Sequence, residues 1–266
     1  MIRRKGVGVL LTKFLEMIGG FMIRRFEEFG TIILLYIDTM KQVPHKPRIK
    51  LILAQMAHLG VDSLAIVSLT LLFTGVVFTL QTAHEFIRFG AQSTVGGIIA
   101  IAIGRELGPV LVGVVCAGRV GAAITAEIST MKVTEQIDAL KVMAVSPVNY
   151  LIVPRMIACM IAVPILTVFG DIIGVAGGWV VATQYSGISS YLFINSIQMF
   201  AHIYDLTGGM IKAIFFGNVI AVLGCYYGLN CPDGAEGVGI ATTRTVVTSI
   251  IVIFILNAML TFVIYR

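Results

Sequence analysis

Five long apolar stretches separated by short polar segments make up most of the chain after residue 60. They cover about residues 61–80, 95–126, 151–183, 208–229 and 245–264. A helix that crosses a bilayer needs about 20 consecutive apolar residues, and each stretch reaches that length. Only 12% of the residues are charged, against roughly 25% in average soluble domains. The pattern predicts an all-α integral membrane protein with about five transmembrane helices, which leaves little chain for a catalytic domain.

Residues 1–50 differ from the rest of the chain, because they hold ten of the nineteen Lys and Arg residues. Apolar side chains recur there three or four residues apart, for example at Leu11, Leu15, Ile18 and Met22. This spacing predicts an amphipathic helix. Its charges are too many for a crossing helix, so we expect it to lie in the cytoplasmic membrane interface, with a soluble regulatory arm as the alternative. Prolines at 44 and 47 end this segment, and residues 51–266 form the transmembrane domain.

The distribution of positive charge predicts the orientation of the chain. Lys46, Arg48 and Lys50 precede the first apolar stretch, whereas residues 184–207 hold no Lys or Arg and several aromatic residues. Cytoplasmic loops are enriched in Lys and Arg, and aromatic residues gather at the membrane interfaces. We therefore expect a cytoplasmic N-terminus and an outer loop with an interfacial helix at 184–207. Five crossings then place the C-terminus, Arg266, on the outer side.

Three charged residues, Arg105, Glu106 and Lys212, fall within apolar stretches. A charge near the bilayer centre costs about 2.5 to 3.5 kcal/mol, so Glu106 needs a partner or water. Neighbouring residues face different sides of a helix, which makes Lys212, or Arg105 of a second subunit, the candidate partner. Two interpretations of Glu106 and its partner stay open. They form a polar site in a lipid path at a dimer interface, or they form an ion pair that only stabilises the packing of the helices. Asp171 and Arg119 are interpreted as packing charges rather than ligands.

Glycine and proline mark two of the apolar stretches. The second stretch is too long for one straight span and is interrupted between residues 104 and 109, which predicts a kinked, tilted or locally broken helix. The third stretch has glycine at every fourth residue, a spacing that lets helices approach closely. The alternative is that glycine is simply frequent in membrane helices. The candidate packing residues are Gly104, Gly108, Pro109, Gly170, Gly174 and Gly178.

The segment 127–146 is the longest polar stretch between two spans, and the topology places it in the cytoplasm. Charged residues alternate there with apolar ones, and Pro147 follows. These features suit a short helix that lies along the membrane surface and docks a partner, with an ordinary polar loop as the alternative. The candidate docking residues are Glu127, Thr130, Met131, Lys132, Thr134, Glu135, Gln136, Asp138 and Leu140.

The sequence contains no pattern typical of a catalytic or metal site. It lacks a GxxxxGK[ST] phosphate loop, a GxSxG elbow and an HExxH pair. The four histidines are scattered, and the four cysteines form no CxxC pair. We therefore expect no metal, no cofactor and no enzymatic activity on this chain. The basic N-terminal segment suits anionic lipid headgroups better than nucleic acid, which needs a soluble basic face.

A long motif gives the chain a family resemblance. GRELGPVLVGVVCAGRVGAAITAEISTMKVTEQIDAL, followed by AVSPVNYLIVPR and later by GIATTRTVV, resembles the signature of the MlaE/YrbE family. Members of this family are permease subunits of ABC transporters that work with MCE proteins on lipid movement across bacterial envelopes. The match runs from about Ala54 to the C-terminus. Members often have an acidic residue late in the last span, where this chain has Asn257.

The resemblance implies a function and a set of partners. Segment 127–146 would be the coupling helix, which seats in a groove of a cytoplasmic ATPase that holds ATP and Mg²⁺. An MCE-domain protein on the outer side and, as a further candidate, a small STAS-domain protein would complete the complex. The cargo would be phospholipid or a related lipid, and the location the bacterial inner membrane. We expect a homodimer, because one short chain encloses little of a pathway.

Two other functions are compatible with a multi-span chain. An ion-coupled secondary transporter would have inverted repeats and broken helices that carry acidic residues, but the five stretches show no convincing two-half symmetry. A membrane scaffold that only recruits a cytoplasmic partner would leave Glu106 and Lys212 without a role.

Overall fold

The computed structural model describes residues 3–43 and 48–266, and within these ranges the regular structure is helical throughout. Short π-helical or 3₁₀ segments connect several of the helices. The α-helices are α1 (Arg3–Gln42), α2 (Ile49–Leu59), α3 (Leu64–Arg88), α4 (Val95–Ala102), α5 (Gly108–Cys116), α6 (Ala122–Val133), α7 (Gln136–Val142), α8 (Val153–Gln184), α9 (Ser190–Phe200), α10 (Ile203–Leu229) and α11 (Gly234–Ile264).

In the part of the chain that the structure describes, five helical segments are long and apolar enough to cross a membrane, which confirms the predicted all-α membrane class. They are Ile49–Arg88, Gln92–Val133, Val148–Gln184, Ile203–Leu229 and Gly234–Ile264. Each predicted apolar stretch falls within one of them. The first segment is longer than predicted because it includes α2, an apolar helix that a short 3₁₀ turn (Val61–Ser63) joins to α3. The last is longer because α11 begins in the polar residues before the apolar stretch.

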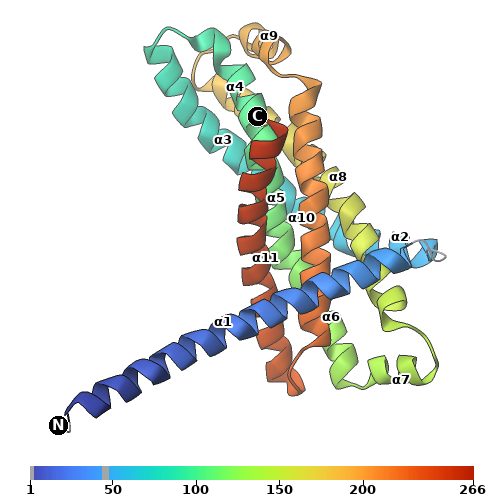
Figure 1. The fold of residues 1–266 in the computed structure, drawn as a ribbon. Coiled ribbons are helices and arrows are strands. Elements are labelled where there is room, and N and C mark those ends of the chain that lie inside the picture. Colours follow the sequence, from blue (N-terminus) through green and yellow to red (C-terminus); the bar gives the residue numbers. More distant parts are fainter. Residues whose placement is uncertain (1–2, 44–47) are drawn as a thin grey trace.

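Helix α10 lies in the middle of the bundle, and α11 lies at its edge (Figure 1). Side chains of α10 are buried against α5, α6, α8 and α11. Helix α11 buries only a narrow stripe with a spacing of four residues, which includes Ala241, Thr245, Ser249 and Ile253. Its other faces expose large apolar side chains such as Phe254. Such a surface suits lipid or a second chain.

Helix α1 crosses one end of the bundle at a steep angle and extends well beyond it (Figure 1). Its C-terminal half is attached by side-chain hydrogen bonds to α10. Tyr227 Oη donates to Glu28 Oε1 at 2.9 Å, and Asn218 Nδ2 donates to Tyr36 Oη at 3.2 Å. Phe26 and other apolar side chains of this half are exposed. The helix is therefore present as expected, and its place in the membrane interface stays a prediction.

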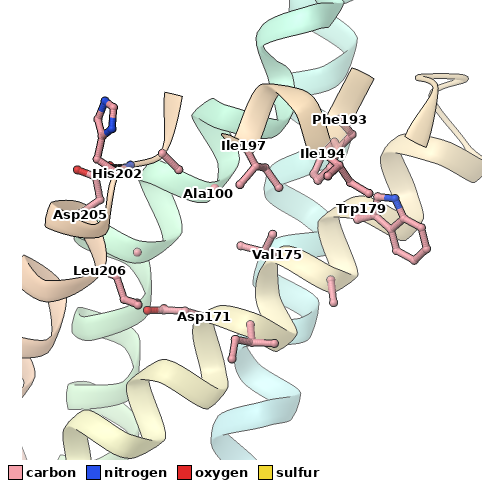
Figure 2. A pocket seen from close by; sticks show the side chains of 14 residues that line it. Ala100, Asp171, Val175, Trp179, Phe193, Ile194, Ile197, His202, Asp205 and Leu206 are labelled. Atoms are coloured by element: carbon pink, nitrogen blue, oxygen red, sulfur yellow. Dashed lines mark hydrogen bonds between the residues drawn. The ribbon is translucent and has the colours of Figure 1, made fainter. Parts of the chain in front are cut away.

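A cavity of about 540 Å³ lies beneath α9, at the opposite end of the bundle from α7. Side chains of α8, α9 and the first turn of α10 line most of it (Figure 2). Trp179 lies at its rim, where its indole N–H donates to Ser190 Oγ at 3.0 Å. An amphipathic ring in this position is typical of a membrane interface.

The two ends of the bundle give a test of the topology. Helix α7 lies at one end, while α9 and the C-terminus lie at the other (Figure 1). Thiol reagents that cannot cross the membrane should therefore label Asp138→Cys from the cytoplasmic side and Tyr191→Cys from the outer side. The four native cysteines are buried, so their background labelling should be small. Labelling of both variants from one side would overturn the arrangement.

Candidate functional site

The second span changes locally from α-helical to π-helical geometry at the charged pair. The five residues Ile103–Leu107 (η3) form a π-helical turn between α4 and α5. Pro109 has no N–H, so it cannot donate to the carbonyl of Arg105 as an α-helical residue would. That carbonyl instead accepts a hydrogen bond from Lys212 Nζ at 2.9 Å. Single π-helical turns inside α-helices are frequent at functional sites. The predicted interruption between residues 104 and 109 thus takes the form of a π-turn.

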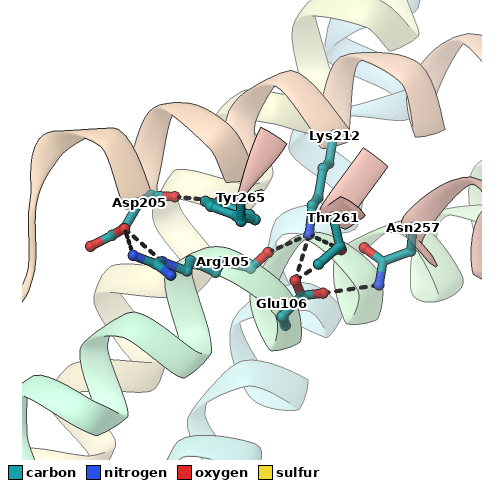
Figure 3. A network of polar contacts seen from close by, with 7 residues as sticks. All are labelled: Arg105, Glu106, Asp205, Lys212, Asn257, Thr261 and Tyr265. Carbon is teal, nitrogen blue, oxygen red and sulfur yellow. Dashed lines mark hydrogen bonds and ion pairs between the residues drawn. The ribbon is translucent and has the colours of Figure 1, made fainter. Parts of the chain in front are cut away.

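Glu106 and Lys212 form the centre of a polar network between η3, α10 and α11 (Figure 3). Lys212 Nζ lies 2.8 Å from Glu106 Oε1 and donates to Thr261 Oγ1 at 2.7 Å. Thr261 Oγ1 in turn donates to Glu106 Oε1 at 2.9 Å. Asn257 Nδ2 donates to Glu106 Oε2 at 2.9 Å. With the Arg105 carbonyl included, all three protons of the Lys212 ammonium have acceptors.

The two charges of this ion pair differ in accessibility. The Lys212 side chain is 0% exposed, whereas the Glu106 side chain is 38% exposed. A buried ammonium inside a membrane domain requires a nearby negative charge, and Glu106 provides it. The Glu106 side chain is therefore partly accessible, although both of its carboxylate oxygens accept hydrogen bonds within the network.

Arg105 points away from Glu106, toward the start of α10 (Figure 3). Its guanidinium lies 2.6 Å from Asp205 Oδ1 and 4.7 Å from the centre of the Tyr265 ring. Asp205 Oδ2 accepts a hydrogen bond from the backbone N–H of His202, which fixes the first turn of α10. Arg105 thus has a partner within its own chain. It does not need Glu106 of a second subunit, which was the alternative pairing considered from the sequence.

Sequence reasoning did not identify Asp205, Thr261 or Tyr265 as members of this site. Asp205 was placed in the outer loop at 184–207, whereas the structure places it in the first turn of α10. The other two lie near the end of the last span, where polar residues are unremarkable. Asn257 was noted only as a neutral residue where an acid is common. The position of Asn257 in the last span could have indicated the site, because the structure shows that its side-chain amide donates a hydrogen bond to Glu106.

The segment 127–146 consists of two helices rather than one. Helix α6 continues from the second span to Val133, and α7 begins at Gln136. Between them Glu135 has a φ of +58°, a left-handed conformation, and the chain turns there so that α7 lies across the end of the bundle (Figure 1). Thr134, Gln136 and Asp138 are exposed on this turn and on α7. The short surface helix is therefore confined to Gln136–Val142, at one end of the bundle (Figure 1).

The predicted docking residues on α6 have neighbours within the bundle. Glu127 Oε2 lies 2.7 Å from the guanidinium of Arg155 on α8. Lys132 Nζ donates to the carbonyl of Cys231 at 2.7 Å. Thr130 donates to the carbonyl of Ala126, one turn earlier. Met131 and Leu140 are partly buried against the core. The exposed docking candidates are thus Thr130 on α6, Thr134 and Glu135 in the turn, and Gln136 and Asp138 on α7.

The three glycines of α8 face α3 in close contact. A Cβ built at Gly170 would lie 3.0 Å from Leu71 Cγ, and one at Gly174 would lie 3.1 Å from the Leu71 carbonyl oxygen. A Cβ at Gly178 would lie 2.5 Å from Thr79 Oγ1. A side chain at Gly178 would force a neighbour to move, and one at Gly170 or Gly174 would require shifts of a few tenths of an ångström. The four-residue glycine spacing therefore coincides with the α3–α8 contact.

The glycines of the second span have different surroundings. A Cβ at Gly108 would lie 1.7 Å from Asp171 Oδ1, so this glycine lets α5 contact the acidic side chain of α8. A Cβ at Gly104 would meet no atom within 4 Å, since this residue lines the cavity beneath α9. Its backbone carbonyl nevertheless lies close to α10, where a Cβ at Gly209 would be 2.2 Å away.

Gly75 of α3 gives a direct test of this close packing. Its Cβ would lie 1.9 Å from the Gly174 carbonyl oxygen, so Gly75→Ala must force α3 and α8 apart. We expect a loss of stability of about 1 to 3 kcal/mol, typical of overpacking, measured as a lower unfolding temperature in lipid nanodiscs. The matched control is Gly118→Ala, because a Cβ there meets no atom within 4 Å. Equal stability of the two variants would contradict the packing.

Comparison with known proteins identifies the family of the chain. Residues 52–263 match the family model described as Permease MlaE. A probable ABC transporter permease protein of Synechocystis is 46% identical over 214 residues, 80% of this chain and 81% of that protein. A probable ABC transporter permease protein of Rickettsia typhi is 39% identical over 98% of this chain and 96% of its own length. The intermembrane phospholipid transport system permease protein MlaE of Haemophilus influenzae is 39% identical over 225 residues, 83% of this chain and 86% of its own. The chain is an ABC transporter permease and belongs to the MlaE family.

Proposed function

We propose that the chain is the membrane subunit of a transporter that moves phospholipid or a related lipid between the bacterial inner membrane and an MCE-domain partner on the outer side. A separate cytoplasmic ATPase, with bound ATP and Mg²⁺, supplies the energy. The observation that supports this best is the Glu106–Lys212 ion pair inside the spans, in which the Glu106 side chain is partly exposed. The names of the relatives agree, since one of them is a phospholipid transport permease.

The network around Glu106 provides hydrogen-bond partners for a lipid headgroup within an otherwise apolar bundle. A lipid that leaves its leaflet must bring its headgroup past apolar side chains, which is costly without polar partners. Glu106 and Asn257 can accept and donate hydrogen bonds there while Lys212 keeps the carboxylate ionised. The exposed apolar faces of α11 fit a homodimer in which two such sites face a shared path.

One continuous helical segment connects this site to the proposed ATPase contact. Residues Gln92–Val133 run through η3 at Glu106 and a second π-turn, Ala117–Gly121 (η4), to the turn before α7. Helices bend most readily at such turns. A displacement of α7 by the ATPase is therefore transmitted along this segment to Glu106. By this proposal α7 and the turn at Glu135 form the coupling helix, and a small STAS-domain protein is a further candidate partner on the cytoplasmic side.

The test is transport in proteoliposomes that contain the chain, its ATPase and the MCE protein. We expect movement of a fluorescent phospholipid to the MCE protein that requires both ATP and Mg²⁺. Movement driven by an ion gradient without ATP would show a secondary transporter instead. A complex that recruits the ATPase but moves no lipid under either condition would show a scaffold.

A further inference from the structure

Two basic residues at the start of the first span have no acidic partner. Arg48 directly precedes α2 and makes no capping hydrogen bond, and Lys50 lies in the first turn of that helix. Both are exposed. Other cations of the spans, such as Arg105 and Lys212, are paired with carboxylates. Among the described residues no carboxylate pairs with Arg48 or Lys50, so both charges are available to an anion.

Arg48 and Tyr150 together line two pockets. One, of about 330 Å³, lies between Arg48 and the loop before α8, and the other, of about 430 Å³, lies along the first turn of α2. The Arg48 guanidinium lies 4.6 Å from the centre of the Tyr150 ring. Stacking on a ring orients the guanidinium plane, and its N–H groups can still bind the oxygens of a phosphate in pairs.

The other residues of these pockets also suit an anion. Neither pocket is lined by Asp or Glu. Asn149 lines the smaller pocket, and its side-chain amide makes no hydrogen bond to another described residue. The carboxylate of Asp38, near the end of α1, accepts a hydrogen bond from Gln42 and lines neither pocket. The site thus offers two cations and a neutral donor, which matches a ligand with a negative charge and several oxygen acceptors.

The position of the pockets favours a lipid headgroup over a soluble anion. Two of the spanning segments begin at Ile49 and Val148, beside the pockets, so the pockets lie at the level where headgroups meet the apolar core. Ile49 and Leu53, which lie one turn apart on the same face of α2, are 65% and 59% exposed. An acyl chain can lie along this face while the phosphate of the same lipid contacts Arg48.

We propose that these two pockets bind the headgroup of an anionic membrane phospholipid, with its phosphate between Arg48 and Lys50 and an acyl chain against Ile49 and Leu53. A zwitterionic headgroup also has a phosphate, but its ammonium is repelled by the two cations. The bound lipid holds the start of α2 against the loop that joins α7 to α8. It is a resident lipid rather than cargo, so the proposal does not depend on transport or on the Glu106 network.

The test identifies the lipids that contact α2 in the purified chain, without ATP or an ATPase. A photocrosslinker replaces Leu53 in nanodiscs with equal amounts of phosphatidylglycerol, phosphatidylethanolamine and phosphatidylcholine that have the same acyl chains. Mass spectrometry identifies the crosslinked lipid. We expect phosphatidylglycerol to exceed each of the others by about fivefold, because each unpaired cation attracts the anionic headgroup. The same crosslinker at Phe73, an exposed residue farther along the first span, should show no such preference.

Two double variants test whether the pocket cations select the lipid. Arg48→Gln with Lys50→Gln should remove the preference at position 53. Both side chains are exposed, so the fold should persist, and an unchanged unfolding temperature in phosphatidylcholine nanodiscs would verify this. Lys141→Gln with Arg244→Gln is the matched control, because it removes the same total charge at exposed positions outside the pockets. This control should keep the preference.

Four results would overturn the proposal. A preference retained in the Arg48 and Lys50 variant would show that these cations do not select the lipid. Its loss in the control would show an effect of overall charge. An equal preference at positions 53 and 73 would show that phosphatidylglycerol surrounds the whole span. Inorganic phosphate in place of chloride at equal ionic strength should leave the preference unchanged, and its loss there would mean that the pockets bind a soluble anion.

Discussion

Lys212→Met is expected to destabilise the protein by about 3 kcal/mol, because it leaves Glu106 without its counter-charge inside the bundle. The partial exposure of Glu106 puts the loss at the lower end of the range of about 3 to 5 kcal/mol for broken buried pairs. Thr261 and the Arg105 carbonyl also lose a donor. The measurement is the unfolding temperature in lipid nanodiscs. The control, Lys141→Met, breaks an exposed ion pair with Asp138 and should cost less than about 1 kcal/mol.

The double variant Glu106→Gln, Lys212→Met separates the two interpretations of the ion pair. It removes both charges and keeps their approximate size, and neutral replacement of a whole buried pair often costs little stability. We expect the double variant to recover most of the stability lost in Lys212→Met and yet to fail in ATP-dependent lipid transport. A stable double variant that transports normally would show that the pair serves helix packing alone.

The Glu106–Lys212 contact illustrates how far sequence reasoning reaches. The cost of an isolated charge in a membrane indicated that Glu106 needs a partner, and Lys212 was the basic residue in the fourth span. The rest of the network could not be derived in this way. Asn257 and Thr261 are ordinary in a span until the rotation of α11 about its axis is known. That rotation depends on the packing of its Ala241, Thr245 and Ser249 stripe.

The segment 127–146 shows a second limit, which concerns helix boundaries. Its polar composition indicated that the chain leaves the membrane there. Composition alone does not show where one helix ends and the next begins, because α6 carries polar residues that bond to α8 and to the loop before α11. The boundary is the left-handed turn at Glu135, and glutamate gives no sequence signal for that conformation. The π-turn at 103–107 was more predictable, because Pro109 removes a backbone donor.

Reversing charge at both Glu135 and Asp138 is expected to reduce recovery of the ATPase with the permease at least tenfold. Both side chains are exposed at the end of the bundle that α7 occupies, next to the exposed apolar side chains of Val142 and Met143. An apolar patch rimmed by charge is typical of a docking surface, and like charges placed across an interface suppress binding. The measurement is co-purification of the ATPase and lipid-coupled ATP hydrolysis.

The fold should survive this double reversal. Lysine tolerates the left-handed backbone at position 135 no worse than glutamate does, and the Asp138–Lys141 pair is exposed and contributes little stability. A lost interaction can then be assigned to the surface itself. Glu236→Lys is the matched control, because it reverses an exposed acidic residue in the first turn of α11, at the same end of the bundle but outside α7. If the double reversal leaves ATPase recovery equal to that of Glu236→Lys, α7 is not the contact, and the continuous segment from Gln92 to Val133 does not link the ATPase to Glu106.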